Sequence, residues 1–191
     1  MPKVGMEPIR RKALVEATIA EISAAGSLDV TVSAISRRAG VSSGLAHHYF
    51  GGKEQIFQAA MRHILRVFGA EVAQRLADAP TPRGRLEAVI RASFWDTAFK
   101  PASVSAWLNL YVRAHSNAEA LRLLRVYQSR LRSNLLHDLR PLCGARADDI
   151  ACGIGALIDG LYIRAALGGA QETAHAADIV LSYLNAELKR Q

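Results

Sequence analysis

The stretch SAISRRAGVSSGLAHHYFGGKE, residues 33–54, is divided into short segments by glycines. Ile35 and Ala39 recur at helical spacing before Gly40, and Ser42 or Ser43 then begins another short segment that runs to about His48. Gly40 supplies the positive φ angle that a tight turn between two helices requires. The proportions are those of a helix-turn-helix, so we expect one here. Thr31 is expected to cap the first of its two helices.

The second of these helices presents small polar residues and imidazoles on the side that faces away from the expected core. They are Ser42, Ser43, Gly44, His47 and His48. Hydroxyl and imidazole groups can reach phosphates and base edges. Gly44 costs about 1 kcal/mol relative to alanine inside a helix, which is understandable if a partner must approach the backbone closely. We therefore predict that this side of the helix contacts DNA.

Several flanking residues complete the predicted DNA interface. Lys53 opens the next helix, where free amides and a cation can hold a phosphate together. Tyr49 adds a hydroxyl, and Thr31 is included at the start of the first helix. A basic amino-terminal group is expected to lie along the duplex or in its minor groove. Its members are Lys3, Arg10, Arg11 and Lys12.

The adjacent histidines could instead belong to a metal or catalytic site. His47 and His48 point about 100° apart on a helix, so they cannot chelate one ion well. The sequence around His63, Cys143 and Cys152 shows no zinc-ligand spacing. We expect no metal and no cofactor. We also expect no enzyme, because the chain lacks a Gly-rich phosphate loop, a Gly-x-Ser-x-Gly elbow and paired acids in a loop.

The composition is that of a globular protein with a basic surface. The chain has 191 residues, a formal net charge of +7 and a pI of about 9.8, which favours an anionic partner such as nucleic acid. Its two cysteines make no disulfide framework, and no signal peptide is evident, so we expect a cytoplasmic protein. The apolar run 151–170 includes Asp159 and Arg164, and a charge at a membrane-helix centre costs about 2.5–3.5 kcal/mol. We interpret it as a buried helix and expect no membrane partner.

Helical spacing of apolar residues recurs along the whole chain, so the expected fold is all-α. Besides the two short helices, we expect helices at 9–25, 53–77, 83–99, 103–116, 118–140, 147–168 and 173–189, with DAPTP (78–82) as the clearest linker. The expected organisation is an amino-terminal three-helix helix-turn-helix domain, residues 1–52, joined to a larger helical domain, residues 53–191, for effector binding and dimerisation.

Aromatic residues in the middle of the chain suggest a ligand pocket. A cluster of rings beside a carboxylate suits a quaternary ammonium group, since each ring face contributes about 0.5–2 kcal/mol. The candidates are Phe94, Trp95, Asp96, Trp107, Tyr111, Asp159 and Tyr162. The alternative is that such a stripe of rings is ordinary core.

Residues 34–54 resemble the DNA-binding domain of TetR-type repressors, with the Gly-Val, Ser-Ser-Gly and His-Tyr-Phe elements in the expected order before Lys53. The opening MPKVGMEPIRRKALVEATI, AWL (106–108) and ALIDGLYIRAAL (156–167) are similar to the BetI-type branch of that family, the choline-responsive repressors of glycine-betaine synthesis genes. The resemblance implies a homodimer on a palindromic double-stranded operator, released or modulated by choline or betaine aldehyde.

Two alternatives remain open beside this interpretation. The first is a TetR-type repressor of a different small molecule, such as a lipophilic cation, and the second is a helical bundle that merely has a basic surface. The expected dimer contact is a small-residue surface on helix 147–168, formed by Gly153, Gly155, Ala156 and Gly160, which permits close approach of another helix. The same surface could instead pack within its own subunit.

Overall fold

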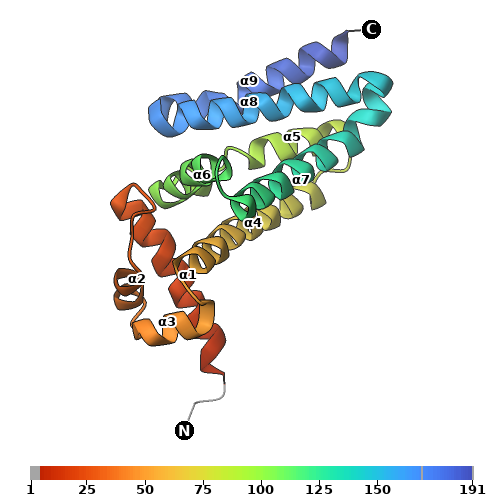
Figure 1. The fold of residues 1–191 in the computed structure, drawn as a ribbon. Helices are drawn as coiled ribbons and strands as arrows, with labels where there is room; N and C mark the ends of the chain where they lie inside the picture. The colour runs from red at the N-terminus through yellow and green to blue at the C-terminus, as the bar shows by residue number, and fades with distance from the viewer. Residues whose placement is uncertain (1–4, 169, 191) are drawn as a thin grey trace. The chain divides into compact units, whose positions relative to one another are not determined.

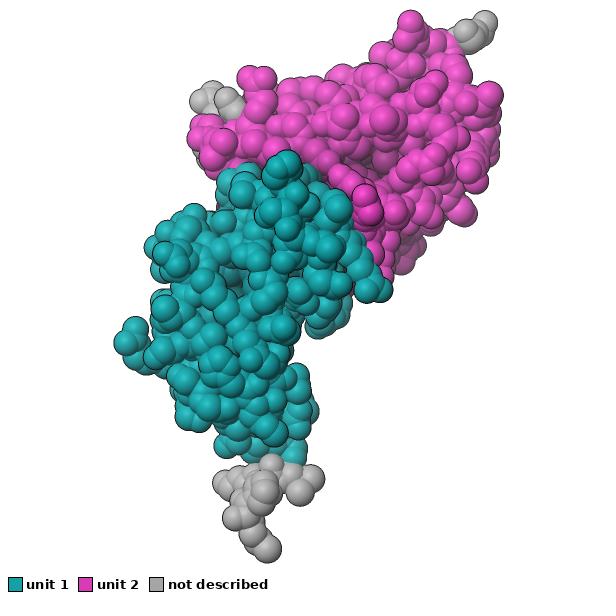
Figure 2. All heavy atoms as spheres, in the orientation of Figure 1, with its two compact units in different colours: residues 1–66, 100–124 teal, residues 67–99, 125–191 magenta. Residues whose placement is uncertain are grey.

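The computed structural model describes residues 5–168 and 170–190, and all regular elements in those ranges are helical (Figure 1). This confirms the all-α prediction. The chain forms two compact units, unit 1 with residues 1–66 and 100–124 and unit 2 with residues 67–99 and 125–191 (Figure 2). We describe each unit by itself. The functional division into residues 1–52 and 53–191 stays a prediction.

Unit 1 is built around α1 (Met6–Ala25), which packs against α2 (Val32–Arg38), α3 (Ser43–Phe50) and α6 (Pro101–Ala114). The buried stripe of α1 follows helical spacing, with Leu14, Thr18 and Ile22 almost fully enclosed. Because Thr18 is buried, its hydroxyl donates to the Leu14 carbonyl oxygen at 2.7 Å. Gly26 then adopts a left-handed conformation and ends the helix, as the sequence predicts.

Side-chain caps and one turn shape the helix-turn-helix. The Thr31 hydroxyl oxygen accepts a hydrogen bond from the Ala34 amide at 3.0 Å, and the Ser42 hydroxyl oxygen accepts one from the Leu45 amide at 3.2 Å. Gly40 has φ +67°, which the turn requires. Ile35 of α2 and Ala46 of α3 are buried in the core of the motif, with relative exposures of 1% and 0%. These observations confirm the predicted motif.

The chain passes from unit 1 into unit 2 twice, each time within a long helix, and returns to unit 1 between η1 (Asp96–Phe99) and α6. α4 (Lys53–Ala77) begins in unit 1 and ends in unit 2, and α7 (Ala118–Cys143) does the same. The predicted DAPTP linker follows α4. Within it Thr81 caps α5 (Pro82–Ala92) by accepting from the Gly84 amide at 3.0 Å. Pro82 occupies the first helical position, where its missing N–H costs nothing.

The expected helix 83–99 is wrong beyond Ala92. The Ser93 and Phe94 amides bond to the carbonyls three residues back, those of Ile90 and Arg91, at 3.1 and 3.2 Å, so the last turn tightens and the helix ends. The buried Ser93 hydroxyl also donates to the Val89 carbonyl at 3.0 Å. The chain then turns, and residues 96–99 form a separate 3₁₀ helix, η1 (Asp96–Phe99). Pro101 does not separate helices as expected but begins α6. The expected helix 83–99 would place Trp95 and Phe99 one turn apart, and they do not lie so, because Phe99 belongs to η1.

Unit 2 contains the carboxy-terminal helices. η2 (Gly144–Arg146) links α7 to α8 (Ala147–Gly168), and α8 runs alongside α9 (Ala170–Lys189) (Figure 1). Gly153 of α8 faces α9 closely, since an added Cβ would overlap the Tyr183 hydroxyl. Buried Asp138 of α7 accepts from the Arg85 Nε of α5 at 3.0 Å, so the charge is paired.

Among the residues that the structure describes, one run of consecutive helices, α7 to α8 (Ala118–Gly168), is long and apolar enough to span a membrane by length and composition alone. Its most apolar window has a mean hydropathy of 1.6, and 33% of that window is buried. A bundle helix that packs on one side and offers an apolar surface on the other has the same properties. We retain the prediction of a helix that stays outside the membrane.

Candidate nucleic-acid interface and effector site

The predicted reading surface of α3 is accessible in unit 1. Ser42, Gly44, His47 and His48 are exposed, and Ser43 is half-buried. Gly44 is an ordinary helical residue, and nothing lies within 4 Å of the position that a Cβ would take there. The folded chain therefore gives no packing reason for glycine at this position, which leaves room for a close external partner.

Two of these residues also stabilise the ends of α3. The Ser42 hydroxyl oxygen caps the amino terminus, so its proton stays available to a phosphate. At the other end, His47 Nδ1 lies 3.2 Å from the Gly51 carbonyl oxygen. If Nδ1 carries the proton in this bond, Nε2 of a neutral ring can only accept. His47 would then suit a base-edge donor better than a phosphate oxygen.

Arg11 of the predicted basic group is held against the end of α3. Its guanidinium lies 5.3 Å from the centre of the Tyr49 ring and 5.1 Å from that of Phe50. Its Nε also donates to Glu7 Oε1 at 2.8 Å. These contacts give Arg11 a structural role in addition to any contact with DNA. Arg10 is half-buried on the same helix, and Lys3 lies outside the described residues.

Lys53 is the first residue of α4, as the sequence predicts. Its Nζ lies 4.0 Å from Asp29 Oδ1, and the Asp29 side chain is fully exposed. An ion pair so open to water contributes little. The ammonium group can therefore exchange Asp29 for a phosphate at low cost.

The next residue, Glu54, ties the start of α4 to α6 within unit 1. Its carboxylate pairs with the Arg113 guanidinium and accepts from Asn117 Nδ2 at 3.3 Å. Arg113 also lies 5.5 Å from the centre of the Phe57 ring. The sequence alone did not indicate this network, because its members are separated by about sixty positions, 59 and 63 along the chain.

The effector candidates of unit 2 form part of an aromatic cluster. The Tyr162 ring lies 5.0 Å from Phe99, and Phe99 lies 6.5 Å from Phe94, with nearly parallel planes. The Tyr127 hydroxyl donates to Asp159 Oδ1 at 3.4 Å. Burial raises the pKa of Tyr162, so its phenol is neutral at physiological pH.

The other effector candidates lie beside and on η1 and on α6. Trp95 is half-buried, and Asp96 is exposed at the start of η1. Trp107 and Tyr111 pair in unit 1 with ring centres 6.3 Å apart. Tyr127 was missed, and so was Phe68, whose ring lies 5.9 Å from it. Helical spacing from Leu123 and Leu131 could have placed Tyr127 on the buried side of α7, but its contacts with Phe68 and Asp159 depend on how the helices pack.

No group of three or more His, Cys, Asp or Glu side chains that could hold a metal ion occurs in the part of the chain that the structure describes. The two cysteines are free, with Cys143 half-buried and Cys152 exposed on α8.

Comparison with known families decides the class of protein. Residues 14–60 match the bacterial regulatory proteins of the tetR family, and residues 82–189 match the carboxy-terminal part of BetI-type transcriptional repressors. The chain belongs to the TetR family as a BetI-type repressor. The family consists of transcriptional regulators rather than enzymes, and the helix-turn-helix is its DNA-binding element.

Individual relatives agree with this membership. The HTH-type transcriptional regulator BetI of Brucella melitensis biotype 2 is 48% identical over 100% of this chain and 98% of its own length. A transcriptional regulator of Pseudomonas aeruginosa PAO1 is similar in structure, with a TM-score of 0.85, 26% identity and coverage of 96% of this chain and 92% of its own. A regulator from Saccharomonospora viridis, solved in complex with choline, shares the TetR fold at a TM-score of 0.79, 21% identity and coverage of 92% and 95%.

Proposed function

We propose that this BetI-type repressor binds a palindromic operator as a homodimer in the cytoplasm. The genes that it controls would encode the enzymes that convert choline to glycine betaine. In this proposal choline, or betaine aldehyde, is the effector that modulates operator binding. The observations that carry the effector assignment are two contacts in unit 2, Phe99 with Tyr162 and Tyr127 with Asp159. Asp159 and Tyr162 are three residues apart on α8 and therefore lie on one side of that helix, so we treat the four residues as one cluster. The choline complex of the S. viridis regulator supports it by analogy of fold.

The cluster has the chemistry that a quaternary ammonium group requires. Choline carries a permanent charge but no N–H on its cationic head, so it cannot be held by hydrogen bonds there. Neutral ring faces attract such a cation by about 0.5–2 kcal/mol each when water is excluded. The Asp159 carboxylate, with the Tyr127 hydroxyl as its partner, adds charge attraction. Trp107 and Tyr111 remain predicted effector residues in unit 1.

The DNA-binding part of the proposal rests on α3 and its flanks. Base edges are proposed to be read by Ser43, Gly44, His47 and His48. The DNA backbone is proposed to be contacted by Arg10, Arg11, Thr31, Ser42, Tyr49 and Lys53. The exposed, weakly paired Lys53 and the unobstructed Gly44 support this division. Backbone contacts would fix the register, and base contacts would carry the sequence preference.

A dimer face is proposed on the exposed side of α8 and α9. Cys152, Ala156 and Gly160 recur every four residues along α8 and are exposed, with Leu167 further along the helix and Ile179 on α9. Gly153 is excluded from this face because it contacts Tyr183 of its own α9. This face has small residues at its centre and large apolar residues at its end, and both features suit close packing against a second copy.

Effector binding is proposed to act as a population shift between two conformations of different operator affinity. Choline can shift the equilibrium only by the difference in its affinity for the two states. The Glu54–Arg113 pair offers a coupling route inside unit 1, since it joins α6 to the turn of α4 that carries Lys53. Movement of α6 would then displace the phosphate contact.

The decisive experiment selects bound duplexes from a random pool, with and without choline. We expect a palindromic consensus, and we expect choline or betaine aldehyde to change its affinity. An unchanged affinity with both compounds would remove the effector assignment, and a lipophilic-cation panel would then test the alternative ligand class.

A second experiment asks which carboxylate serves the effector. Choline-induced shifts in melting temperature are compared for the unaltered protein, Asp159→Asn and Asp96→Asn, each of which removes one charge at nearly constant shape. We expect Asp159→Asn to weaken choline binding about tenfold, or about 1.4 kcal/mol, and Asp96→Asn to have little effect. A larger loss of choline affinity in Asp96→Asn than in Asp159→Asn would place the effector site at η1 instead.

A further inference from the structure

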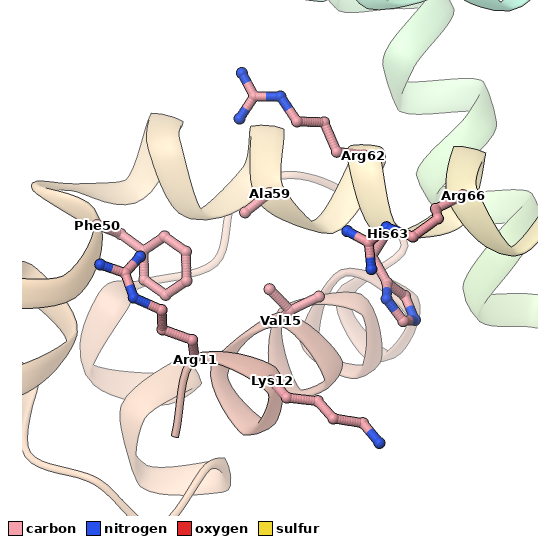
Figure 3. A pocket seen from close by; sticks show the side chains of 8 residues that line it. All are labelled: Arg11, Lys12, Val15, Phe50, Ala59, Arg62, His63 and Arg66. Carbon is pink, nitrogen blue, oxygen red and sulfur yellow. The ribbon is translucent and has the colours of Figure 1, made fainter. Parts of the chain in front are cut away.

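A separate cavity lies in unit 1, between α1 and α4, with the end of α3 closing one side (Figure 3). Its volume is about 390 Å³. This is near the lower end of the range of about 300–1,000 Å³ that is typical of small-molecule sites. None of its lining residues belongs to the aromatic cluster of unit 2, and among them only Arg11 belongs to the proposed DNA interface.

The floor and the rim of this cavity differ in chemistry. Val15, Phe50 and Ala59 provide an apolar floor, and the remaining lining residues, which we call the rim, are Arg11, Lys12, Arg62, His63 and Arg66. In Figure 3 the side chains of Lys12 and Arg62 extend away from the floor. In Figure 3 Arg11 lies beside Phe50 at one end, and His63 and Arg66 lie together at the other. An apolar base under several cations is the reverse of what a choline-like ligand requires.

The acidic groups nearby leave part of this charge uncompensated. Glu7 pairs with Arg11 at 2.8 Å and Glu16 with Lys12 at 3.8 Å, both along the exposed side of α1. Arg66 has no carboxylate within 4 Å among the residues that the structure describes. Unpaired guanidinium groups above apolar surface bind carboxylates and phosphates through paired N–H donors.

His63 lines the same cavity, and both its burial and the surrounding charges affect its pKa. Burial lowers the pKa of His63, and the charges of Arg66 and Lys12 lower it further, while Glu16 acts in the opposite direction. A bound anion next to the ring would oppose these effects.

We propose that the cleft between α1 and α4 binds a small organic anion, with a carboxylate or phosphate head at the Arg66 end and a short apolar body over Val15 and Ala59. The two head groups share the chemistry that a guanidinium recognises, and the volume limits the apolar body to a short chain or one ring. The occupant has the opposite charge to the effector proposed for unit 2, so the two sites would respond to different compounds.

The DNA backbone is the competing occupant for these cations. Duplex phosphates could contact exposed arginines, but they carry no apolar group that would cover Val15 and Ala59. A duplex would therefore bind at the rim without depending on the floor. Substitutions in the rim and in the floor separate the two cases.

The test measures binding of hexanoate and phenyl phosphate by calorimetry, with inorganic phosphate and hexan-1-ol as ligand controls. Arg66→Gln removes a head-group contact, and Ala59→Leu fills the floor without changing charge. Arg122→Gln on α7, an exposed arginine elsewhere in unit 1, is the matched control. We expect saturable binding that falls at least tenfold in Arg66→Gln and in Ala59→Leu and is unchanged in Arg122→Gln.

Nuclear magnetic resonance titration of His63 provides an independent readout. Saturating hexanoate should raise the pKa of His63, and Arg66→Gln should abolish this response while leaving the protein folded. Hexan-1-ol should not change the pKa.

Three outcomes would overturn the proposal. Equal losses in Arg66→Gln and Arg122→Gln would show diffuse attraction to a basic surface. Inorganic phosphate binding as tightly as phenyl phosphate, with no effect of Ala59→Leu, would show that the floor is not a site. Absence of saturable probe binding, together with a flatter salt dependence of duplex binding in Arg66→Gln, would assign these cations to the DNA backbone.

Discussion

Gly44 is the residue at which stability and recognition are most clearly separable. Alanine is favoured over glycine in a helix by about 0.5–1 kcal/mol, and no atom of the folded chain would obstruct the added methyl group. We predict that Gly44→Ala raises the free energy of unfolding by this amount yet lowers operator affinity, because the methyl group would meet the duplex. Urea unfolding and fluorescence anisotropy measure the two effects.

The control for Gly44 is Gly69→Ala in α4, which is equally unobstructed in the folded chain. It should gain similar stability without losing operator affinity. If Gly44→Ala binds the operator as tightly as the unaltered protein, α3 does not approach the duplex as closely as we propose.

Substitutions of Lys53 and of Ser43 are predicted to weaken DNA binding in different ways. Lys53→Gln should weaken binding to all duplexes and reduce the slope of log K against log salt by about 0.9, because one phosphate contact is lost. Ser43→Ala should instead lower specific affinity by about 1–3 kcal/mol if its hydroxyl reads a base. Anisotropy titrations at several salt concentrations, with operator and random duplex, distinguish the two. Equal losses on both duplexes for Ser43→Ala would contradict its base-reading role.

At this scale the sequence was informative where a residue acts locally. Thr31 was expected at a cap and Gly40 in a turn, and Ser42 or Ser43 was expected to begin a helix; Thr31, Gly40 and Ser42 each act within four residues of their own position. The cation–π contacts of Arg11 were not expected, because they depend on how α1 meets α3. Local chemistry is encoded in short patterns, whereas contacts between elements require the packing itself.

At the scale of elements, the Glu54–Arg113 pair is the connection between α4 and α6 that we expect to matter most. Both side chains are about one-third exposed, so solvent screening reduces the energy of the pair. We predict a coupling energy of about 0.5–1.5 kcal/mol in a double-mutant cycle of Glu54→Gln and Arg113→Gln, measured by urea unfolding. The geometry of the pair requires both helices to keep their relative position.

The exposed pair Glu87–Arg91 of α5 is the matched control, with an Nε to Oε1 distance of 2.9 Å. Its coupling should be about 0.3–0.5 kcal/mol, as for other pairs of this spacing. If both cycles give the same coupling energy, the Glu54–Arg113 pair is an ordinary surface pair and does not fix the first turn of α4, which carries Lys53, against α6.

Residues 93–99 show why one element could not be predicted. Their aromatic spacing is compatible with a helix, and that pattern favoured a continuous helix from 83 to 99. The tightened last turn at Ser93 and the burial of Phe94 end α5 instead. Which of the two competing structures forms depends on where Phe94 and Phe99 can be buried in unit 2, and the spacing of apolar residues holds no information on that. The same ambiguity explains why the effector residues were predicted only in part.

At the scale of the whole molecule, a palindromic operator requires two copies of α3 related by a two-fold axis. Two half-sites one duplex turn apart are roughly 34–36 Å from each other, which one protomer cannot read alone. In our proposal the exposed face around Ala156 and Gly160 on α8 therefore controls DNA binding from a distance. A change there should abolish operator binding without altering α3.

Ala156→Glu tests this dependence. Two copies of the glutamate would meet near the two-fold axis without a partner, and burying such a charge is strongly unfavourable. We predict a folded monomer by sedimentation velocity, with helix content unchanged and operator affinity reduced to the level of random duplex. Gln128→Glu on the exposed surface of α7 introduces the same charge elsewhere in unit 2 and should remain a dimer that binds the operator. A dimeric Ala156→Glu protein would place the interface elsewhere, and a monomer that still bound the full operator with unaltered affinity would contradict the requirement for two-fold recognition.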